Sequence, residues 1–231
     1  MLRGLLGIGL VLIGLGRAWA QPSDPAQTNR FEAEIQKFEQ ADSLRAPVTD
    51  SVLFVGSSSI RKWTNLASAF PEWTVLNRGF GGSTLADVDF FFNRVIRPYQ
   101  PRVVVLYEGD NDLARNQTVE QLTDRFEAFV DRLATELPGT SLVLLAVKPS
   151  PSRLSYLPVQ RQLNAELQRL AQTRSRVYFA DTFRPLLNID QQPDPQWYES
   201  DQLHLNPAGY ARWIPVVRAA LEQAVPRPLS P

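Results

Sequence analysis

Short apolar runs alternate with longer segments of helical periodicity along most of this chain. The short runs are rich in β-branched and other strand-forming residues, and they predict strands at 51–55, 74–76, 103–106, 142–147 and 177–180. Between them, apolar residues recur at helical spacing and predict helices at 84–96, 119–137 and 157–171. An amphipathic helix is also expected over 31–44, and Asn206 opens a last helix that runs to about 224.

The predicted strands are apolar on both faces and are separated by helices. This pattern is typical of a parallel sheet that helices cover on both sides, because parallel strands need crossover connections. We therefore expect an α/β fold, a three-layer α/β/α sandwich around a central parallel sheet of about five strands. Such sheets bind ligands beyond the carboxyl ends of their strands, so those ends are where functional residues are expected.

The two ends of the chain differ from this pattern. Residues 1–20 have a short basic start, an uncharged apolar run and small residues up to Ala20, which predicts a cleaved signal peptide. The apolar run is shorter than the roughly 20 residues that span a bilayer, so no stable membrane anchor is expected. We predict an exported protein, periplasmic or secreted, with a flexible leader over 21–30, one domain over 31–225 and a disordered tail over 226–231.

Composition narrows the chemistry. The 24 basic and 24 acidic residues balance, so nothing in the overall charge favours nucleic acid, and a small or mixed-charge substrate is the simpler expectation. The chain has no cysteine, which excludes disulfides, zinc-thiolate sites and a cysteine nucleophile. Oligomeric state does not follow from the sequence.

Two small-residue segments follow the first two predicted strands. Ser57, Ser58 and Ser59 come directly after Gly56, where one of them could be a nucleophile or the run could cap a helix. The G-x-S-x-G elbow of ordinary α/β-hydrolases does not fit, because Ile60 replaces its last glycine. Residues 77–84 contain three glycines, either a plain turn or a close backbone approach to a ligand, and lack the dinucleotide-binding pattern.

Two polar segments lie farther along the chain. Residues 107–112 follow the third strand, and they lack the glycine and glutamate of an EF-hand loop. His204, the single histidine, lies three residues after Asp201, close enough for the carboxylate to fix the imidazole tautomer. Each segment alone is compatible with an ordinary loop. Together they supply a nucleophile, a base, an orienting carboxylate and oxyanion donors, which is the set that acyl transfer through serine requires.

In order and spacing, these four segments resemble the blocks of the SGNH, or GDSL-like, hydrolases, in the platelet-activating-factor acetylhydrolase-like branch. Gly56-Ser57-Ser58, with Trp63 after it, is similar to the first block, Gly-Asp-Ser followed by an aromatic residue. The resemblance implies a flavodoxin-like sheet and selects Ser58 as the nucleophile among the three serines. It departs from the family at Ser57, where the motif has aspartate, and this leaves open the local hydrogen bonds of that aspartate.

The other blocks assign the remaining roles by the same resemblance. Gly82 is similar to the family's second-block glycine and Asn111 to its Gly-x-Asn-Asp asparagine, so the oxyanion hole is expected from the N–H groups of Ser58 and Gly82 and the Asn111 amide. Asp201 and His204 are similar to the Asp-x-x-His block and complete a triad with Ser58. Neither a metal nor a cofactor is expected.

The substrate is less defined than the chemistry. Four aromatic residues near the blocks are candidates for a wall beside the substrate, although such side chains are also ordinary core residues: Trp63, Tyr107, Trp197 and Tyr198. The expected activity is hydrolysis of a small-molecule or glycan-linked acyl ester through an acyl-Ser58 intermediate. The alternatives are an acyltransferase or deacetylase acting on an envelope glycan, and an inactive glycan- or lipid-binding module.

Overall fold

The computed structural model describes residues 29–44 and 48–225. The predicted signal peptide (1–20), the tail (226–231) and most of the predicted leader lie outside these ranges. Asn29 and Arg30, which the sequence places in the leader, already belong to a 3-10 turn, η1 (Asn29–Phe31). No helix within the described ranges is long and apolar enough to cross a membrane.

The centre of the molecule is a five-stranded sheet with the order β2-β1-β3-β4-β5. All of its neighbouring strands are parallel. The strands are β1 (Val52–Gly56), β2 (Val75–Gly79), β3 (Val103–Tyr107), β4 (Ser141–Leu145) and β5 (Val177–Ala180). The predicted α/β class and strand number are confirmed, and each predicted strand is present within a few residues of its expected position.

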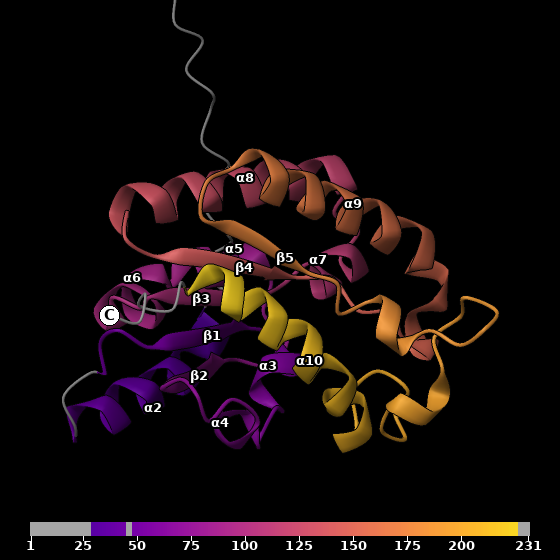
Figure 1. Cartoon of the computed structure of the whole chain (residues 1–231), viewed down its shortest axis with the longest axis horizontal. Helices are drawn as coiled ribbons and strands as arrows, with labels where there is room; N and C mark the ends of the chain where they lie inside the picture. Colours follow the sequence, from indigo (N-terminus) through magenta and orange to yellow (C-terminus); the bar gives the residue numbers. More distant parts are fainter. Residues whose placement is uncertain (1–28, 45–47, 226–231) are drawn as a thin grey trace, which may run out of the picture.

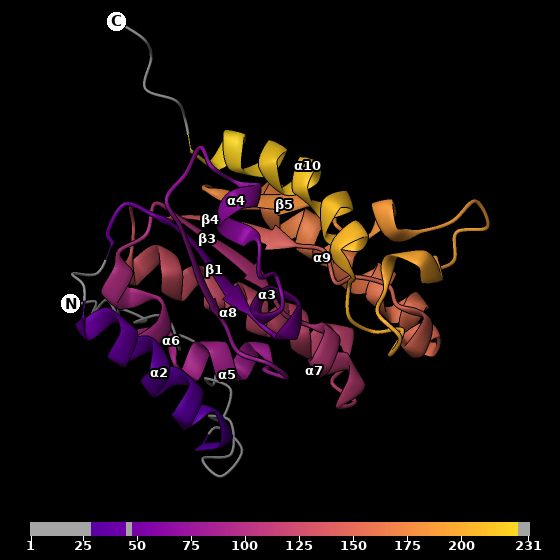
Figure 2. The ribbon, with the colours of Figure 1, turned by 90° about the horizontal axis from the view of Figure 1, so that it is seen from below.

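Helices cover both faces of the sheet, which gives three layers (Figure 1, Figure 2). One face is covered by α2 (Glu32–Ser43), α5 (Leu85–Phe90), α6 (Phe92–Val95), α8 (Val119–Glu136) and α9 (Leu157–Thr173). The other face is covered by α3 (Ser58–Arg61), α4 (Leu66–Ala69) and α10 (Pro207–Ala224). The short helix α7 (Asp110–Ala114) follows β3, and the remaining turns are η2 (Arg97–Tyr99), η3 (Pro151–Tyr156), η4 (Arg184–Leu186) and η5 (Pro195–Trp197).

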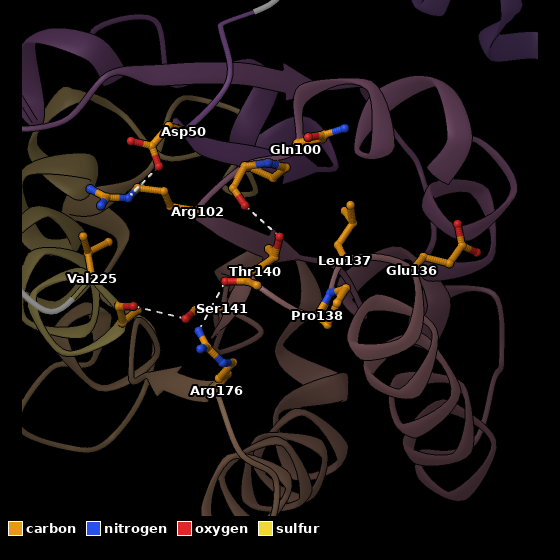
Figure 3. Close-up of a pocket in the computed structure, with 13 residues that line it drawn as sticks. Asp50, Gln100, Arg102, Glu136, Leu137, Pro138, Thr140, Ser141, Arg176 and Val225 are labelled. Atoms are coloured by element: carbon orange, nitrogen blue, oxygen red, sulfur yellow. Dashed lines mark hydrogen bonds and ion pairs between the residues drawn. The ribbon is translucent and has the colours of Figure 1, made fainter.

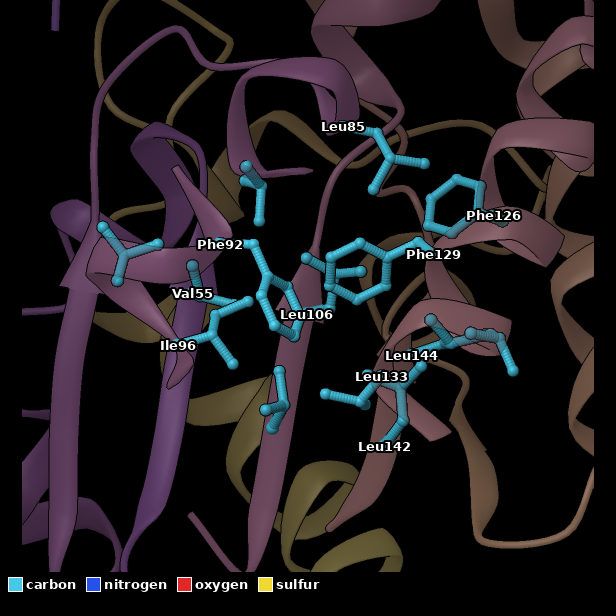
Figure 4. Close-up of a cluster of buried hydrophobic side chains, with 14 of the residues drawn as sticks. Val55, Leu85, Phe92, Ile96, Leu106, Phe126, Phe129, Leu133, Leu142 and Leu144 are labelled. Atoms are coloured by element: carbon cyan, nitrogen blue, oxygen red, sulfur yellow. The ribbon is translucent and has the colours of Figure 1, made fainter. Parts of the chain in front are cut away.

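Two hydrophobic cores form because successive strand residues point to opposite faces. Along β3, Val104 and Leu106 join the core under α8, whereas Val103 and Val105 join the core under α10. Figure 4 shows the first core, where aromatic side chains from α6 and α8 pack over the aliphatic residues of the strands. Sequence could not distinguish the two faces because both are apolar.

The structure departs from the expected elements in two informative places. The helix predicted over 84–96 is divided at Phe91, whose ψ of 7° ends α5 before α6 begins. The strand predicted over 142–147 ends at Leu145, because the neighbouring strand β5 ends at Ala180. Val147 instead pairs with the side chain of Asn164, which accepts from its N–H at 2.7 Å and donates to its carbonyl at 3.0 Å.

A surface pocket of about 660 Å³ lies at the amino ends of the strands. Its lining includes Arg102, Thr140 and Arg176, which immediately precede β3, β4 and β5 in turn (Figure 3). The polar segments singled out in the sequence follow the carboxyl ends instead. This pocket is therefore at the opposite end of the sheet from the candidate chemistry.

Gly56 and Gly139 offer a test of the turn that follows β1. Gly56 has φ +137°, and a Cβ there would lie 2.1 Å from the Tyr107 carbonyl oxygen, whereas a Cβ at Gly139 would meet nothing within 4 Å. We expect Gly56→Ala to lower the free energy of unfolding by at least about 2 kcal/mol. Gly139→Ala should change it by no more than about 1 kcal/mol. Urea unfolding followed by circular dichroism measures both, and equal effects would contradict this account of the turn.

Candidate active site

Three of the four predicted segments meet because the strands before them end in the same row. Gly56 at the end of β1 is paired with Gly79 of β2 on one side and with Tyr107 of β3 on the other. The residues that follow these strands therefore emerge side by side. The fourth segment, with Asp201 and His204, lies in the connection between η5 and α10.

The structure distinguishes the three serines after Gly56. Ser57 and Ser59 are buried, each only 2% exposed, whereas Ser58 is half-buried. Ser57 is the N-cap residue of α3, but its side chain makes no capping hydrogen bond. Only Ser58 of the three faces the histidine, with its Oγ 3.0 Å from His204 Nε2. The helix-capping interpretation therefore does not account for Ser58.

His204 is held on its other side by Asp201. The ring Nδ1 lies 2.6 Å from Asp201 Oδ2, and the backbone N–H groups of Leu203 and His204 donate to Asp201 Oδ1, both at 2.9 Å. Burial acts to raise the pKa of the Asp201 carboxyl, but the hydrogen bonds from His204 and Leu203 outweigh it and hold the pKa well below its usual range. Asp201 is therefore ionised throughout the physiological pH range and fixes the imidazole with Nε2 toward Ser58.

Glu199 links this connection to α3. Its carboxylate lies 2.8 Å from Lys62 Nζ, just after α3, and its N–H donates to the His204 carbonyl at 2.7 Å. Ligand atoms of Glu199, Asp201 and His204 lie within 4.8 Å of one another, which is the spacing of a potential metal site. Each of these side chains already has a partner of its own, in Lys62 or within the Asp201–His204 pair. Nothing further favours a metal there, and the expectation of no metal stays a prediction.

The two further oxyanion candidates, Gly82 and Asn111, lie on adjacent loops. The Asn111 amide donates to the Ser83 carbonyl at 2.9 Å, which connects the segment after β3 to the segment after β2. Gly82 has φ +83°, a backbone conformation that favours glycine. Its carbonyl accepts from Arg30 and Arg115, each at 3.0 Å, so the loop is held from outside.

Asp112 braces the same two loops. Its two carboxylate oxygens accept from the N–H groups of Leu85 and Gly109, each at 3.1 Å. The side chain is buried, and burial raises its pKa to about 6 in spite of these hydrogen bonds. Asp112 therefore ties α5 to the start of α7 and does not face solvent.

Three charged residues near the site have no assigned role in the sequence interpretation: Glu108, Lys148 and Arg153. Glu108 is buried and accepts from the Ser83 hydroxyl at 2.5 Å. Burial, reinforced by the charge of Asp112, raises the pKa of the Glu108 carboxyl well above its usual range. Lys148 pairs with Asp110 at 2.9 Å, and Arg153 donates to Asn111. Only the long-range contacts reveal these partners, because up to 42 residues separate them in sequence.

The predicted aromatic wall is wrong for three of its four members. Trp63, Tyr107 and Tyr198 are at most 5% exposed, so they are core residues that a substrate in solution does not reach. Trp63 stacks on Tyr210 with ring centroids 5.1 Å apart, and the Tyr198 hydroxyl donates to the Pro149 carbonyl at 2.5 Å. Trp197 is partly buried under Arg212, whose guanidinium lies 4.7 Å from the ring centroid. Sequence adjacency to the site does not determine on which side of the sheet a ring packs.

Comparison with known proteins supports the family expected from the sequence. The model of the GDSL-like lipase/acylhydrolase family matches residues 42–212. Among curated proteins, none matches this chain significantly.

Three solved structures share the fold. A Streptococcus pneumonia protein, provisionally described as a platelet activating factor, has a TM-score of 0.73 at 23% identity, covering 85% of this chain and 95% of its own. A GDSL-like lipase from Bacteroides thetaiotaomicron has a TM-score of 0.71 at 19% identity, covering 84% and 99%. A variant of an acetyl-xylooligosaccharide esterase from Geobacillus has a TM-score of 0.60 at 14% identity, covering 81% and 99%.

The raised pKa of Glu108 predicts how stability depends on pH. Its pKa is raised in the folded protein, so the stability it contributes is complete below its unfolded pKa and is lost as the pH rises through its folded pKa. Glu108→Gln retains a side chain of the same shape without this ionisation. We expect urea unfolding to show the variant gaining stability relative to the parent as the pH increases from about 5 upward. Glu120→Gln, at an exposed position on α8, is the control. Parallel stability profiles for the parent and Glu108→Gln would contradict a raised pKa of Glu108 in the folded protein.

Proposed function

Because the chain belongs to the GDSL-like lipase/acylhydrolase family, whose reaction is ester hydrolysis, we propose that it cleaves carboxylic esters through a covalent acyl intermediate on Ser58. The observation that carries this proposal is that His204 contacts both other residues at once. Its Nε2 lies 3.0 Å from Ser58 Oγ, and its Nδ1 lies 2.6 Å from Asp201 Oδ2. A nucleophile, a base and a carboxylate in this order are the parts that serine acyl transfer requires.

In the proposed mechanism, His204 Nε2 takes the Ser58 proton as Oγ attacks the ester carbonyl carbon. Asp201 accepts a hydrogen bond from Nδ1 and stabilises the imidazolium that forms. The imidazolium then protonates the leaving alkoxide, which departs as an alcohol. Water, deprotonated by the same imidazole, attacks the acyl-serine carbonyl carbon. As the bond to Ser58 Oγ breaks and the acid leaves, the imidazolium returns the proton to Oγ, which regenerates Ser58 and neutral His204.

The negative charge of the tetrahedral intermediate needs donors that are already in place. We assign them to the backbone N–H groups of Ser58 and Gly82 and to the Asn111 amide. Ser58 is the first residue of α3, where backbone N–H groups have no acceptor within the helix. The bond from Asn111 to Ser83 O supports this assignment, since it fixes the amide beside the loop that carries Gly82.

The substrate we propose is an acyl ester of a small molecule or a glycan, met outside the cytoplasm. Export rests on the signal-peptide pattern up to Ala20. An acetyl-xylooligosaccharide esterase shares the fold, so acetylated oligosaccharides are worth testing beside simple esters. Added sugar acceptors would separate hydrolysis from acyl transfer in the same assay.

The nucleophile is tested by comparing two adjacent serines. The chain from Gln21 onward, with Ser58→Ala and Ser57→Ala variants, is assayed for p-nitrophenol release from acetyl, butyryl and octanoyl esters. We expect Ser58→Ala to lower kcat by about 10⁶-fold, to the level of the assay background. Ser57→Ala should retain turnover, since Ser57 is buried and does not face His204. Full activity of Ser58→Ala, or loss of activity in Ser57→Ala alone with the fold intact, would contradict the assignment.

The oxyanion role of Asn111 predicts a particular division between the kinetic constants. Removing one oxyanion donor typically lowers turnover by about 100- to 1,000-fold, because the interaction strengthens as charge develops in the transition state. Asn111→Ala should therefore lower kcat by this factor with little change in KM. Steady-state kinetics on p-nitrophenyl acetate measure both constants. A rise in KM at constant kcat would instead assign Asn111 to ground-state binding.

A further inference from the structure

Arg153 reaches from η3 to the candidate oxyanion donor. Its Nη2 donates to Asn111 Oδ1 at 3.0 Å, although 42 residues separate the two in sequence. The arginine side chain is 17% exposed, so most of it lies within the protein. Neither the triad nor the oxyanion assignment above uses Arg153.

This contact determines which way the Asn111 carboxamide points. Guanidinium groups only donate hydrogen bonds, so the atom of Asn111 that faces Arg153 must be the oxygen. The amide nitrogen then faces the opposite side, where one of its two hydrogens is donated to the Ser83 carbonyl at 2.9 Å. The second N–H of the same nitrogen is the group that would donate a hydrogen bond to an oxyanion. Without Arg153, the Ser83 carbonyl alone would hold the carboxamide and the Asn111 oxygen would lose its donor, so the amide could turn about its one remaining contact and direct its second N–H away from the developing negative charge.

Arg153 is itself held rigidly by Asp110. Its Nη1 donates to the Asp110 carbonyl at 2.7 Å and lies 2.6 Å from Asp110 Oδ1. Asp110 Oδ2 lies 2.9 Å from Lys148 Nζ, and the Lys148 and Asp110 side chains are 1% and 7% exposed. Burial acts to raise the pKa of Asp110, but the positive charges of Lys148 and Arg153 outweigh it and keep the pKa below its usual value. Both terminal nitrogens of the guanidinium are thus committed to protein partners.

We propose that Arg153 is a positioning residue, which fixes the Asn111 carboxamide with its free N–H directed to the oxyanion. The inference rests on the proposed ester hydrolysis for its kinetic consequence, but the orientation of the amide is a property of the unliganded protein. The chain Lys148, Asp110, Arg153, Asn111 then connects the end of β4 to the oxyanion hole. Lys148 lies in the loop after β4, Arg153 in η3, and Asp110 and Asn111 in α7. The Asn111 donor is therefore braced by residues from outside its own helix.

The kinetic test is a double-mutant cycle between Arg153 and Asn111. Arg153→Met retains the apolar length of the side chain and removes the donors. We expect it to lower kcat on p-nitrophenyl acetate by about 10- to 100-fold with KM nearly unchanged, because a small misplacement of a catalytic group costs this much. In the Asn111→Ala background, Arg153→Met should lower kcat by no more than about twofold. Arg161→Met, which removes an exposed contact to the Gln191 carbonyl, is the matched control and should leave kcat unchanged.

Three outcomes, two in the kinetics and one in the melting temperature, would overturn the proposal. A rise in KM without a fall in kcat would make Arg153 a substrate-binding group. Losses that multiply in the Arg153→Met, Asn111→Ala double variant would show that the arginine acts independently of the amide. A fall in melting temperature with kcat retained would make it merely structural. Added guanidinium ion should restore part of the kcat of Arg153→Ala. If the substitution only lowered the stability of the fold, guanidinium ion would not restore kcat.

A second readout does not depend on turnover. The side-chain NH₂ group of Asn111 gives a pair of ¹⁵N-correlated NMR signals, assigned by their absence from Asn111→Ala. In the parent these two signals should be sharp, and Arg153→Met should broaden them or change their chemical shifts, while Arg161→Met leaves them unchanged. Unchanged Asn111 signals in Arg153→Met would overturn the proposal. If the parent and Ser58→Ala are equally inactive, the proposed ester hydrolysis fails, and the NMR result still decides the role of Arg153.

Discussion

The parallel register of three strands is the constraint on which the candidate site depends. Gly56 lies opposite both Gly79 and Tyr107, so β1, β2 and β3 end in one row and their following loops start within a strand spacing of each other. The backbone then continues this contact past the sheet, since Ser57 N–H donates to the Tyr107 carbonyl and Phe80 N–H to the Gly56 carbonyl. A shift of one residue in the first pairing would move the loop of Gly82 relative to Ser58, and a shift in the second would move the loop of Asn111.

Buried carboxyl groups hold these loops in place below the surface. Asp112 accepts backbone N–H groups from two loops, Glu108 accepts from Ser83, and Asp110 is paired with two cations. Burying such groups is unfavourable unless each has partners, so a loop that moved would leave a carboxyl unsatisfied. These contacts hold the loops that carry the proposed oxyanion donors. The pKa shifts of the three carboxyl groups differ, since burial raises the pKa of Glu108 and Asp112, whereas the charges of Lys148 and Arg153 lower that of Asp110.

Sequence alone predicted the sheet, the covering helices and the pairing of His204 with Asp201, because these depend on periodicity and on short separations. It left the choice among Ser57, Ser58 and Ser59 open until the family resemblance was considered, and the distance from Ser58 to His204 agrees with that choice. It was wrong about Trp63, Tyr107 and Tyr198, since an aromatic residue near a motif can face either the site or the core. It gave no role to Arg153 or Glu108, whose partners lie far away in sequence and are brought close only by the fold.

The dependence of His204 on the docking of α10 has a consequence for how the site assembles. His204 stays beside Ser58 because α10 docks on the sheet, with the Tyr210 hydroxyl donating to the Ser59 carbonyl and the Trp213 indole donating to the Thr182 carbonyl. A partly folded state in which the sheet has formed but α10 has not docked therefore lacks the contact between Ser58 and His204. The proposed nucleophile and base come together only when α10 packs on the sheet, so a local opening of this one helix would separate them while the five strands stay paired.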